Sequence, residues 1–289
     1  MRALVIGTSG QLATELFRRA SATRLQLLPP LKIDVADEAA VVRHLDEQSP
    51  GIVLNASGYT AVDRAELESE RAFAVNAAGP GALARWCQAH GAALVHVSTD
   101  YVFDGQKSSP YLETDSTAPL NTYGASKLAG EQAVREALQR HLILRTSWVF
   151  SAHGHNFVKT MLKLAREREE LRVVADQRGR PTAAGDLARA MLLAAERMNV
   201  EDNLHGTFHF ANAGAVSWHE FAQTIVDEQA TTTGRRPAVV PIPSSAFPTP
   251  ARRPVSSVLD TQAFERVFGI ACRPWRDALR EVVQELVAP

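Results

Sequence analysis

The stretch Arg2-Ala-Leu-Val-Ile6-Gly7-Thr-Ser-Gly10-Gln11-Leu12-Ala13 opens the chain and decides its fold. Its first part reads as a buried strand that Gly7 ends, and residues 11–21 carry apolar side chains at helical spacing. The G-x-x-G-x-x-A pattern between them is a variant of the glycine turn that holds a dinucleotide diphosphate. Free backbone N–H groups and the positive end of the helix dipole favour an anion there, and glycine lets the backbone approach it. The stretch therefore predicts a dinucleotide-binding unit, with a plain strand-to-helix turn as the alternative.

The same alternation of strand and helix continues through the first half of the chain. Short apolar runs predict strands at 25–28, 52–54, 93–97 and 142–146. Helical spacing predicts helices at 37–48, 66–90 and 123–139, and a break at Gly79-Pro80 stays open. Repeated units of this length imply an α/β fold, a Rossmann-type doubly wound parallel sheet with helices on both faces.

After about residue 150 the pattern changes. Helices are predicted at 154–170, 183–198, 217–229, 261–268 and 275–287, and a proline-rich loop spans 241–254. The strand-like run at residues 207–210 is a candidate for a strand that pairs with the large sheet. We therefore predict a dinucleotide-binding domain at 1–150, with returning segments at about 182–212. Residues 151–181 and 213–289 would form a smaller, mostly helical substrate-binding part.

Composition narrows the class of protein. The 289 residues include 31 Lys plus Arg and 32 Asp plus Glu, which gives a net charge of −1. A balanced charge without a dense basic stripe is not typical of a nucleic-acid binder. We expect no membrane helix and no signal peptide. The two cysteines, Cys87 and Cys272, form no metal pair or disulfide framework, so we expect reduced thiols in a cytoplasmic protein.

The second strand bears on the choice of cofactor. An acidic residue about 20 positions after the glycine turn usually binds the ribose 2′-hydroxyl of NAD. Here the strand ends in Leu28-Pro29-Pro30-Leu31-Lys32, and Asp34 lies beyond the expected strand tip. A missing carboxylate removes repulsion against a 2′-phosphate, and Lys32 adds attraction. The sequence therefore favours NADPH, with NADH as the alternative.

Two further motifs point to chemistry. Tyr123 and Lys127 stand four residues apart at the start of a predicted helix, on one face. A neighbouring ammonium would lower the phenol pKa by about two units from ~10, which makes a general acid; an exposed helix pair is the alternative. Upstream, a buried strand ends in Ser98-Thr99-Asp100, where ligands of parallel sheets bind and a hydroxyl can donate to a substrate oxygen. A turn-forming cluster is the alternative there.

The motifs together resemble the extended short-chain dehydrogenase/reductase superfamily and, within it, the dTDP-4-dehydrorhamnose reductase family. The resemblance covers nearly the whole chain. Its segments are Gly7-Thr-Ser-Gly10-Gln11, Asn55-Ala-Ser-Gly-Tyr-Thr60-Ala-Val-Asp63, Ser98-Thr99-Asp100-Tyr-Val-Phe103, Tyr123-Gly-Ala-Ser-Lys127-Leu-Ala-Gly-Glu131, Arg145-Thr-Ser-Trp148-Val-Phe150, Asn156-Phe-Val-Lys-Thr-Met161, Asp176-Gln177 with Pro181-Thr182, and Phe247-Pro-Thr-Pro-Ala-Arg-Arg-Pro254. It implies an oxidoreductase of nucleotide-sugar and carbohydrate biosynthesis. In that reaction NAD(P)H reduces the C4 keto group of dTDP-4-dehydro-beta-L-rhamnose to give dTDP-L-rhamnose.

The resemblance also implies roles for individual residues. Tyr123 would protonate the C4 oxygen, Lys127 would bind the nicotinamide ribose, and Thr99 would hydrogen-bond the carbonyl oxygen. Asp100 and Trp148 would contact the sugar, and Arg253 would face the dTDP diphosphate. The implied cofactor-binding positions are Gly7, Gly10, Gln11, Leu12, Asp34, Val35, Gly58, Tyr59 and Thr60, together with Tyr123 and Lys127.

Some expectations stay open. Certain relatives bind Mg²⁺ at a dimer interface through neighbouring acids, but residues 183–189 hold one acid, Asp186, so we expect no metal there. Whether the chain forms a homodimer is undecided. One alternative function is a related sugar-nucleotide epimerase or dehydratase, although dehydratases place a glutamate where Tyr101 stands. The other is a non-catalytic regulatory subunit with the same fold.

Overall fold

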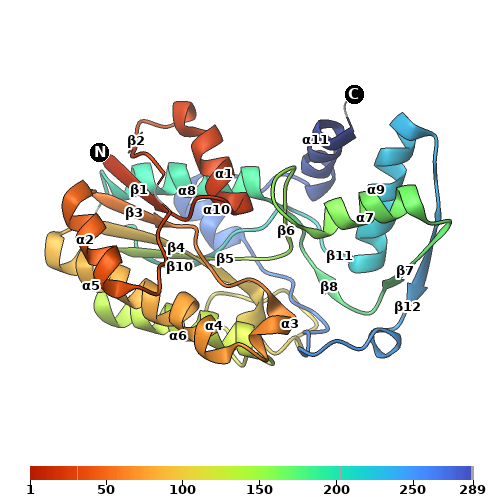
Figure 1. Cartoon of the computed structure of the whole chain (residues 1–289), viewed down its shortest axis with the longest axis horizontal. Coiled ribbons are helices and arrows are strands. Elements are labelled where there is room, and N and C mark those ends of the chain that lie inside the picture. Colours follow the sequence, from red (N-terminus) through yellow and green to blue (C-terminus); the bar gives the residue numbers. More distant parts are fainter. Residues whose placement is uncertain (31, 202, 288–289) are drawn as a thin grey trace.

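The computed structural model describes residues 1–30, 32–201 and 203–287. Its centre is a six-stranded sheet with the order β10-β5-β4-β3-β1-β2, in which every neighbouring pair is parallel (Figure 1). The strands are β1 (Arg2–Ile6), β2 (Gln26–Leu27), β3 (Ile52–Asn55), β4 (Ala93–Thr99), β5 (His141–Thr146) and β10 (Gly206–His209). Because the strand order reverses beside β1, this arrangement confirms the predicted doubly wound sheet.

Helices cover both faces of this sheet because every central strand is apolar on both sides. Alternate residues point to opposite faces, so Val5 of β1 packs into one core cluster and Leu4 into another. One face carries α1 (Gln11–Arg18), α8 (Ala184–Met198) and α10 (Gln262–Phe268), and the other carries α2 (Glu38–Gln48), α5 (Gly79–His90) and α6 (Thr122–Ala137) (Figure 1).

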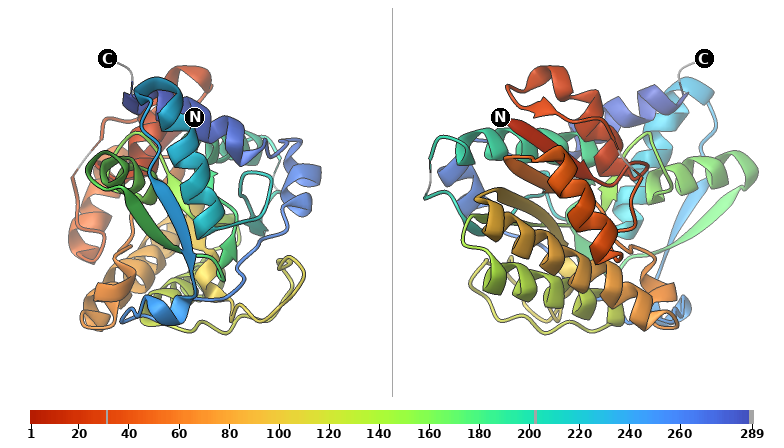
Figure 2. Two further views of the ribbon diagram at one scale, coloured as in Figure 1. Left: turned by 90° about the vertical axis from the view of Figure 1, so that its right-hand side faces the viewer. Right: turned by 60° about the vertical axis from the view of Figure 1, so that its left-hand side comes forward.

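The second part of the chain lies beyond the carboxyl ends of the strands. It contains α7 (Phe157–Glu167), α9 (Trp218–Thr233) and α11 (Trp275–Val287), which share a separate apolar core (Figure 2). It also contains three two-stranded pairs: β7 (Glu170–Val174) with β12 (Ala238–Ile242), β8 (Arg178–Gly179) with β11 (Val216–Ser217), and β6 (Val149–Phe150) with β9 (Thr182–Ala183). The sequence analysis did not predict these pairs. The predicted division into domains stays a prediction, although β10 pairs with β5 in the large sheet.

The region predicted as one helix at 66–90 is more complex. It comprises α4 (Ser69–Phe73), a π-helical segment η2 (Ala74–Ala78) and α5, preceded by the short α3 (Val62–Ala65). Helical backbone continues through Gly79, so the helix is not broken there. The π-helical turn before Gly79 is the irregularity in this region. Three short 3-10 helices complete the chain: η1 (Ala20–Ala22), η3 (Asp100–Val102) and η4 (Ser244–Ala246).

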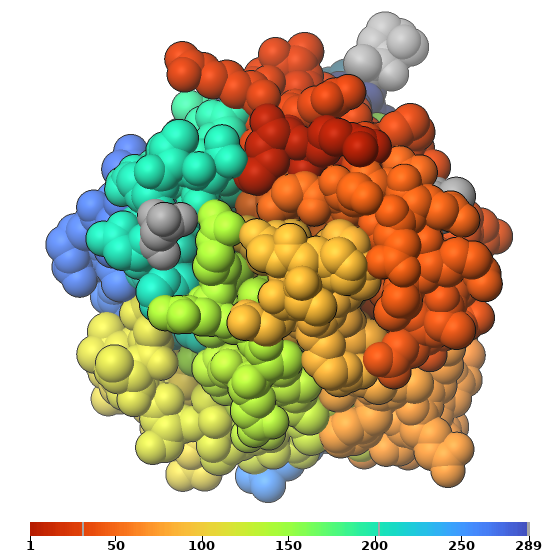
Figure 3. Space-filling view, turned by 90° about the vertical axis from the view of Figure 1, so that its left-hand side faces the viewer, coloured from red at the N-terminus to blue at the C-terminus, as the bar shows by residue number. Residues whose placement is uncertain are grey.

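The end of the molecule where the strands begin is formed mostly by the N-terminal half of the chain (Figure 3). The C-terminal helices appear only at the margin of that view. In the described part of the chain, no helix is both long and apolar enough to cross a membrane.

Candidate active site

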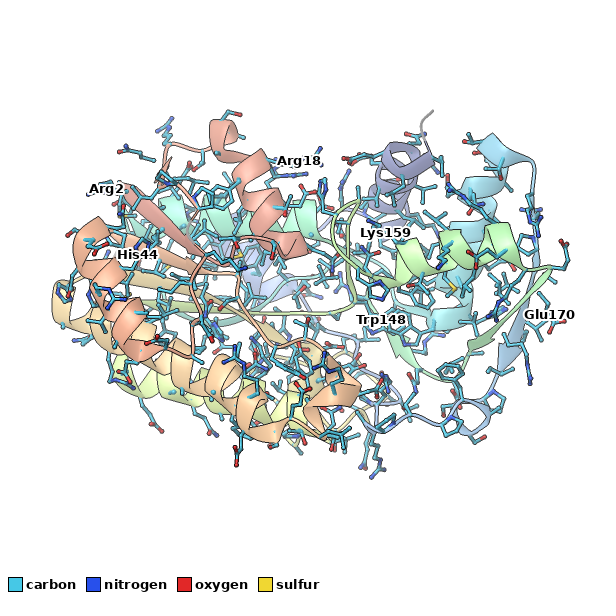
Figure 4. The ribbon with its side chains drawn as sticks, in the orientation of Figure 1. Arg2, Arg18, His44, Trp148, Lys159 and Glu170 are labelled. Atoms are coloured by element: carbon cyan, nitrogen blue, oxygen red, sulfur yellow. The ribbon has the colours of Figure 1, made fainter. Side chains whose placement is uncertain are left out.

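A cavity of about 410 Å³ lies at the carboxyl ends of the central strands. Both parts of the chain contribute to it, and Trp148 lies between them (Figure 4). Ten residues singled out from the sequence line it: Gly10, Gln11, Leu12, Gly58, Thr60, Thr99, Asp100, Tyr123, Lys127 and Trp148. Residues separated by more than 130 positions in the chain therefore meet at one opening.

The glycine turn forms one wall of this cavity. Gly7 has φ +113°, a conformation that favours glycine, and it lies against the backbone of Ala56. Gly10 is the N-cap of α1 without any side-chain cap, and the space around its missing Cβ is open to 4 Å. Uncapped N–H groups beside open space fit a dinucleotide diphosphate. On this observation the residues present suit NAD(P)H.

Tyr123 and Lys127 enter the cavity from the first turns of α6. Asn121 caps this helix, since its Oδ1 accepts from the N–H of Gly124 at 2.8 Å. The ring of Tyr123 meets Tyr101 edge-on, with centroids 5.8 Å apart. The Nζ of Lys127 donates to the carbonyl oxygen of Val97 in β4 at 2.6 Å. The ammonium is thus held by the strand end.

The protonation of this pair differs from the sequence-based expectation. Burial raises the pKa of Tyr123 to about 12, and the charge of Asp100 adds to the effect, while a hydrogen bond with Thr99 opposes it. The expected decrease toward ~8 is wrong for this structure, because desolvation dominates and Lys127 is directed to Val97. Burial also lowers the pKa of Lys127 to about 8. Near neutral pH the tyrosine therefore carries its proton.

Thr99 and Asp100 face Tyr123 from the end of β4. The Thr99 hydroxyl donates to Oδ1 of Asp100 at 3.0 Å. Oδ2 of Asp100 is buried and has no hydrogen-bond partner among the described residues. Burial raises the pKa of Asp100 to about 7, although the polar side chains of Ser257 and Thr99 oppose the shift. A buried carboxyl oxygen on the cavity wall without a partner is suited to a hydroxyl of a ligand.

The loop after β3 is linked to α6 by Asn76, which the sequence analysis missed. Its Oδ1 accepts from the N–H of Tyr59 at 2.8 Å, and its Nδ2 donates to the Tyr59 carbonyl at 3.0 Å and to Oγ of Ser126 at 2.9 Å. The side chain of Tyr59 itself turns away and donates to Glu68 at 2.6 Å. The available signal in the sequence was an asparagine within an apolar helical run, because such a side chain needs hydrogen-bond partners once the helix packs.

Trp148 is held as a rigid wall of the cavity. Its φ is +49°, which is uncommon for a bulky residue. Its indole stacks on Trp218, with centroids 3.5 Å apart and planes 6° from parallel. On β8, a Cβ at Gly179 would lie 2.6 Å from Nε1 of Trp148, so only glycine fits there. Trp218 was missed, although Ser217-Trp-His-Glu220 is a capping-box signature that marks a helix start.

Arg253 does not line this cavity but a second one of about 460 Å³. The two cavities share Trp218. Arg253 donates to both oxygens of Asp63, at 3.0 and 2.8 Å. Around it the second cavity is lined largely by apolar side chains such as Phe157 and Phe247. Its placement beside the first cavity leaves room for an extended ligand.

Asp34 and Val35, two of the predicted cofactor-binding residues, also lie outside the first cavity. Asp34 accepts from Arg71 at 3.0 and 2.9 Å, on the surface. Its pKa is lowered, chiefly by the N–H of Ala36 and further by Arg71. Val35 is buried against Gly79. The cofactor role of both residues stays a prediction.

Residues 1–30, 32–201 and 203–287 contain no group of three or more His, Cys, Asp or Glu that could hold a metal ion. Asp186 is hydrogen-bonded to Asn212 and paired with Arg273 instead. Cys87 and Cys272 are buried free thiols.

Comparison with known proteins places this geometry in a family. The model of the RmlD substrate binding domain family matches residues 1–288. The chain belongs to this family. A curated member, dTDP-4-dehydrorhamnose reductase of Burkholderia thailandensis, is 45% identical over 299 residues, and the match covers 100% of each chain.

Two solved structures of the family resemble the chain closely. A dTDP-4-dehydrorhamnose reductase from Clostridium acetobutylicum has a TM-score of 0.91 at 37% identity and covers 99% of each chain. The enzyme from Bacillus anthracis, solved in complex with NADP, has a TM-score of 0.88 at 36% identity. That match covers 98% of this chain and 99% of the other.

Proposed function

We propose that the chain reduces the C4 keto group of dTDP-4-dehydro-beta-L-rhamnose with NADPH, which gives dTDP-L-rhamnose. The observation that carries the proposal is the convergence of Thr99, Tyr123 and Lys127 with the glycine turn on one cavity. The names of the full-length relatives and the NADP complex of one of them support it.

The chemistry divides between cofactor and protein. When bound, NADPH supplies the two reducing electrons at the carbonyl carbon. The keto oxygen would lie within reach of the hydroxyls of Thr99 and Tyr123, which both line the first cavity. An alkoxide is far more basic than a phenolate, so Tyr123 gives up its proton to that oxygen despite its raised pKa. Lys127, anchored on Val97, would bind the nicotinamide ribose and place a positive charge on the wall of the first cavity.

Residues outside this centre would bind the rest of the substrate. The indole of Trp148 offers a flat apolar wall to the sugar ring, and Asp100 offers its unpaired oxygen to a sugar hydroxyl. The nucleotide would extend past Trp218 into the second cavity, where Arg253 is suited to a diphosphate. Arg253 would have to share its donors between Asp63 and that ligand.

The alternatives have specific weaknesses. In a dehydratase the residue after Asp100 would be an acid, whereas here it is Tyr101, packed against Tyr123. A regulatory subunit needs no proton donor, yet the full set of Thr99, Tyr123 and Lys127 lines one cavity. The cytoplasmic location and the homodimer stay predictions for this chain.

The deciding experiment is an assay with purified protein, NADPH and dTDP-4-dehydro-beta-L-rhamnose. We expect stoichiometric loss of nicotinamide absorbance at 340 nm and formation of dTDP-L-rhamnose by chromatography and mass spectrometry. An epimerase or dehydratase would convert the sugar without net cofactor oxidation, and a regulatory subunit would convert nothing. Either result would reject the proposal. Parallel reactions with NADH give the cofactor preference.

A further inference from the structure

Glu131 is a charged residue that neither the sequence analysis nor the proposed reaction gives a role. It lies on α6 one turn after Lys127 and two turns after Tyr123, and its side chain is fully buried. Buried carboxylates are costly unless they are paired and hydrogen-bonded. The structure therefore has to compensate this group, and the way it does so connects it to the catalytic centre.

Four hydrogen bonds from three elements end on this carboxylate. Ser98 of β4 donates to Oε1 at 2.6 Å. Arg145 of β5 donates from Nε to Oε1 at 2.8 Å and from Nη2 to Oε2 at 2.7 Å, a bidentate pair. Arg135, one turn later on α6, donates to Oε2 at 3.1 Å. Glu131 thus fastens α6 to two neighbouring strands of the sheet.

The position of these contacts is what links them to catalysis. Ser98 and Arg145 are direct neighbours in the β4–β5 ladder, one residue before the pair Thr99 and Thr146. Glu131 is therefore bonded to the sheet one residue before Thr99, whose hydroxyl faces Tyr123. A shift of α6 along or around its axis would have to break this contact before it moved Tyr123 away from Thr99.

The charge of Glu131 also reaches Lys127. Burial lowers the pKa of Lys127, and the negative charge of Glu131 opposes that shift. The Glu131 carboxyl keeps its own charge, because the bonds from Arg145 and Ser98 outweigh its burial and hold its pKa below the usual value. His96 on β4 is neutral, since burial and then the charge of Lys127 lower its pKa. The remaining cations near the carboxylate are Arg145 and the half-exposed Arg135.

We propose that Glu131 is a positioning residue for the catalytic pair: its carboxylate fixes α6 against the ends of β4 and β5 and places a negative charge one helical turn from Lys127. The inference rests on the proposed function, because it assigns Glu131 to the reaction of Tyr123 and Lys127. It predicts that the charge of residue 131 affects the pH dependence of the reaction as well as the stability of the fold.

The test compares Glu131→Gln with Glu136→Gln, an exposed glutamate on the same helix. Glutamine keeps the shape but not the charge of Glu131. We expect the alkaline limb of the kcat profile to move to lower pH by about one unit, the lower end of what a nearby opposite charge contributes to a pKa. The KM for the nucleotide sugar should stay unchanged. The Glu136→Gln enzyme should match the wild type in both respects.

A second variant covers the case in which Glu131→Gln does not fold. Arg135→Ala removes a partly exposed cation that faces Glu131, so the carboxylate acts more strongly on Lys127. The alkaline limb should then move the other way, to higher pH, by a few tenths of a unit at low salt. A wild-type pH profile in Arg135→Ala, or in a folded Glu131→Gln enzyme, would overturn the inference. Failure of the proposed function is distinct, since the wild type itself would then show no NADPH oxidation.

Discussion

At the scale of single residues, Tyr123 is a partly buried tyrosine on the cavity wall whose phenol holds its proton at neutral pH. Its raised pKa reflects desolvation, so the acid strength the sequence suggested is absent from this structure. In the proposed reaction, Tyr123 would therefore act through its position on the cavity wall with Thr99 more than through a lowered pKa.

Replacement of Tyr123 by Phe removes that proton and leaves the ring in place. We expect kcat to fall by about 10²–10⁴-fold, the usual contribution of a general acid. NADPH binding, measured by fluorescence titration, should remain within about twofold of the wild type. Tyr111→Phe, which removes a hydroxyl bonded to Asp104 away from the cavity, is the matched control. Full turnover by Tyr123→Phe would show that another group protonates the oxygen.

The raised pKa of Asp100 predicts how the free energy of unfolding depends on pH. Its pKa is about 7 in the folded chain, above the ordinary value of 3.8, so the folded state holds a proton that the unfolded state has lost. This group therefore destabilises the fold increasingly as pH rises from about 4 to about 7. Asp100→Asn should raise Tm more at pH 8 than at pH 5, by several degrees at about 2–4 °C per kcal/mol. An equal change at both pH values, measured by calorimetry beside Glu136→Gln, would refute it.

At the scale of elements, the two short strands β8 and β11 determine how Trp148 is held in the cavity wall. It places Gly179 on one side of the site and leads directly into Trp218, the first residue of α9, so both supports of the Trp148 indole come from one ladder. Such a short pair has no periodicity to detect, which is why the sequence could not predict it.

Gly179→Ala tests this support. The added methyl group would collide with the indole of Trp148, which has no room to retreat because Trp218 stacks on it. We expect a loss of about 1–3 kcal/mol in stability from overpacking and a KM for the nucleotide sugar raised about tenfold, with the KM for NADPH unchanged. Arg178→Ala, an exposed neighbour on the same strand, should leave both KM values alone. An unchanged sugar KM in Gly179→Ala would show that the indole does not shape that subsite.

At the scale of the whole molecule, the cavity joins the large sheet to the C-terminal part. His155, Asn156 and Trp218 line it from the part of the chain beyond β5. Asn156 also donates to Oε1 of Gln11 at 3.0 Å, which ties the two parts together at the turn. A ligand bound between them should therefore stabilise both.

NADPH should consequently raise the melting temperature as its concentration rises. At a hundred times its Kd the gain is about 2.7 kcal/mol, which corresponds to about 5–10 °C for a chain of this size. Differential scanning fluorimetry with NADPH and NADH would measure it and rank the two cofactors. The absence of any shift at millimolar NADPH would contradict the assigned cofactor site.

The sequence predicted the sheet, and it singled out residues that the fold brings to one cavity, because both signals are local. Strand, turn and helix are continuous in Arg2–Arg18, and Tyr123 and Lys127 share one helix face. Features that depend on distant partners could not be predicted. The direction of the Lys127 ammonium depends on Val97, and the link of Asn76 to Tyr59 and Ser126 crosses three elements.

The stacked pair of Trp148 and Trp218 has a spectroscopic consequence. Two indoles that are nearly parallel and 3.5 Å apart couple their electronic transitions, and the chain has only 4 tryptophans in all. The near-ultraviolet circular dichroism of the protein should contain an exciton signal from this pair. The signal should change when a sugar binds against the indole of Trp148. The protein thereby contains an intrinsic optical reporter, which needs no label, for the arrival of its substrate.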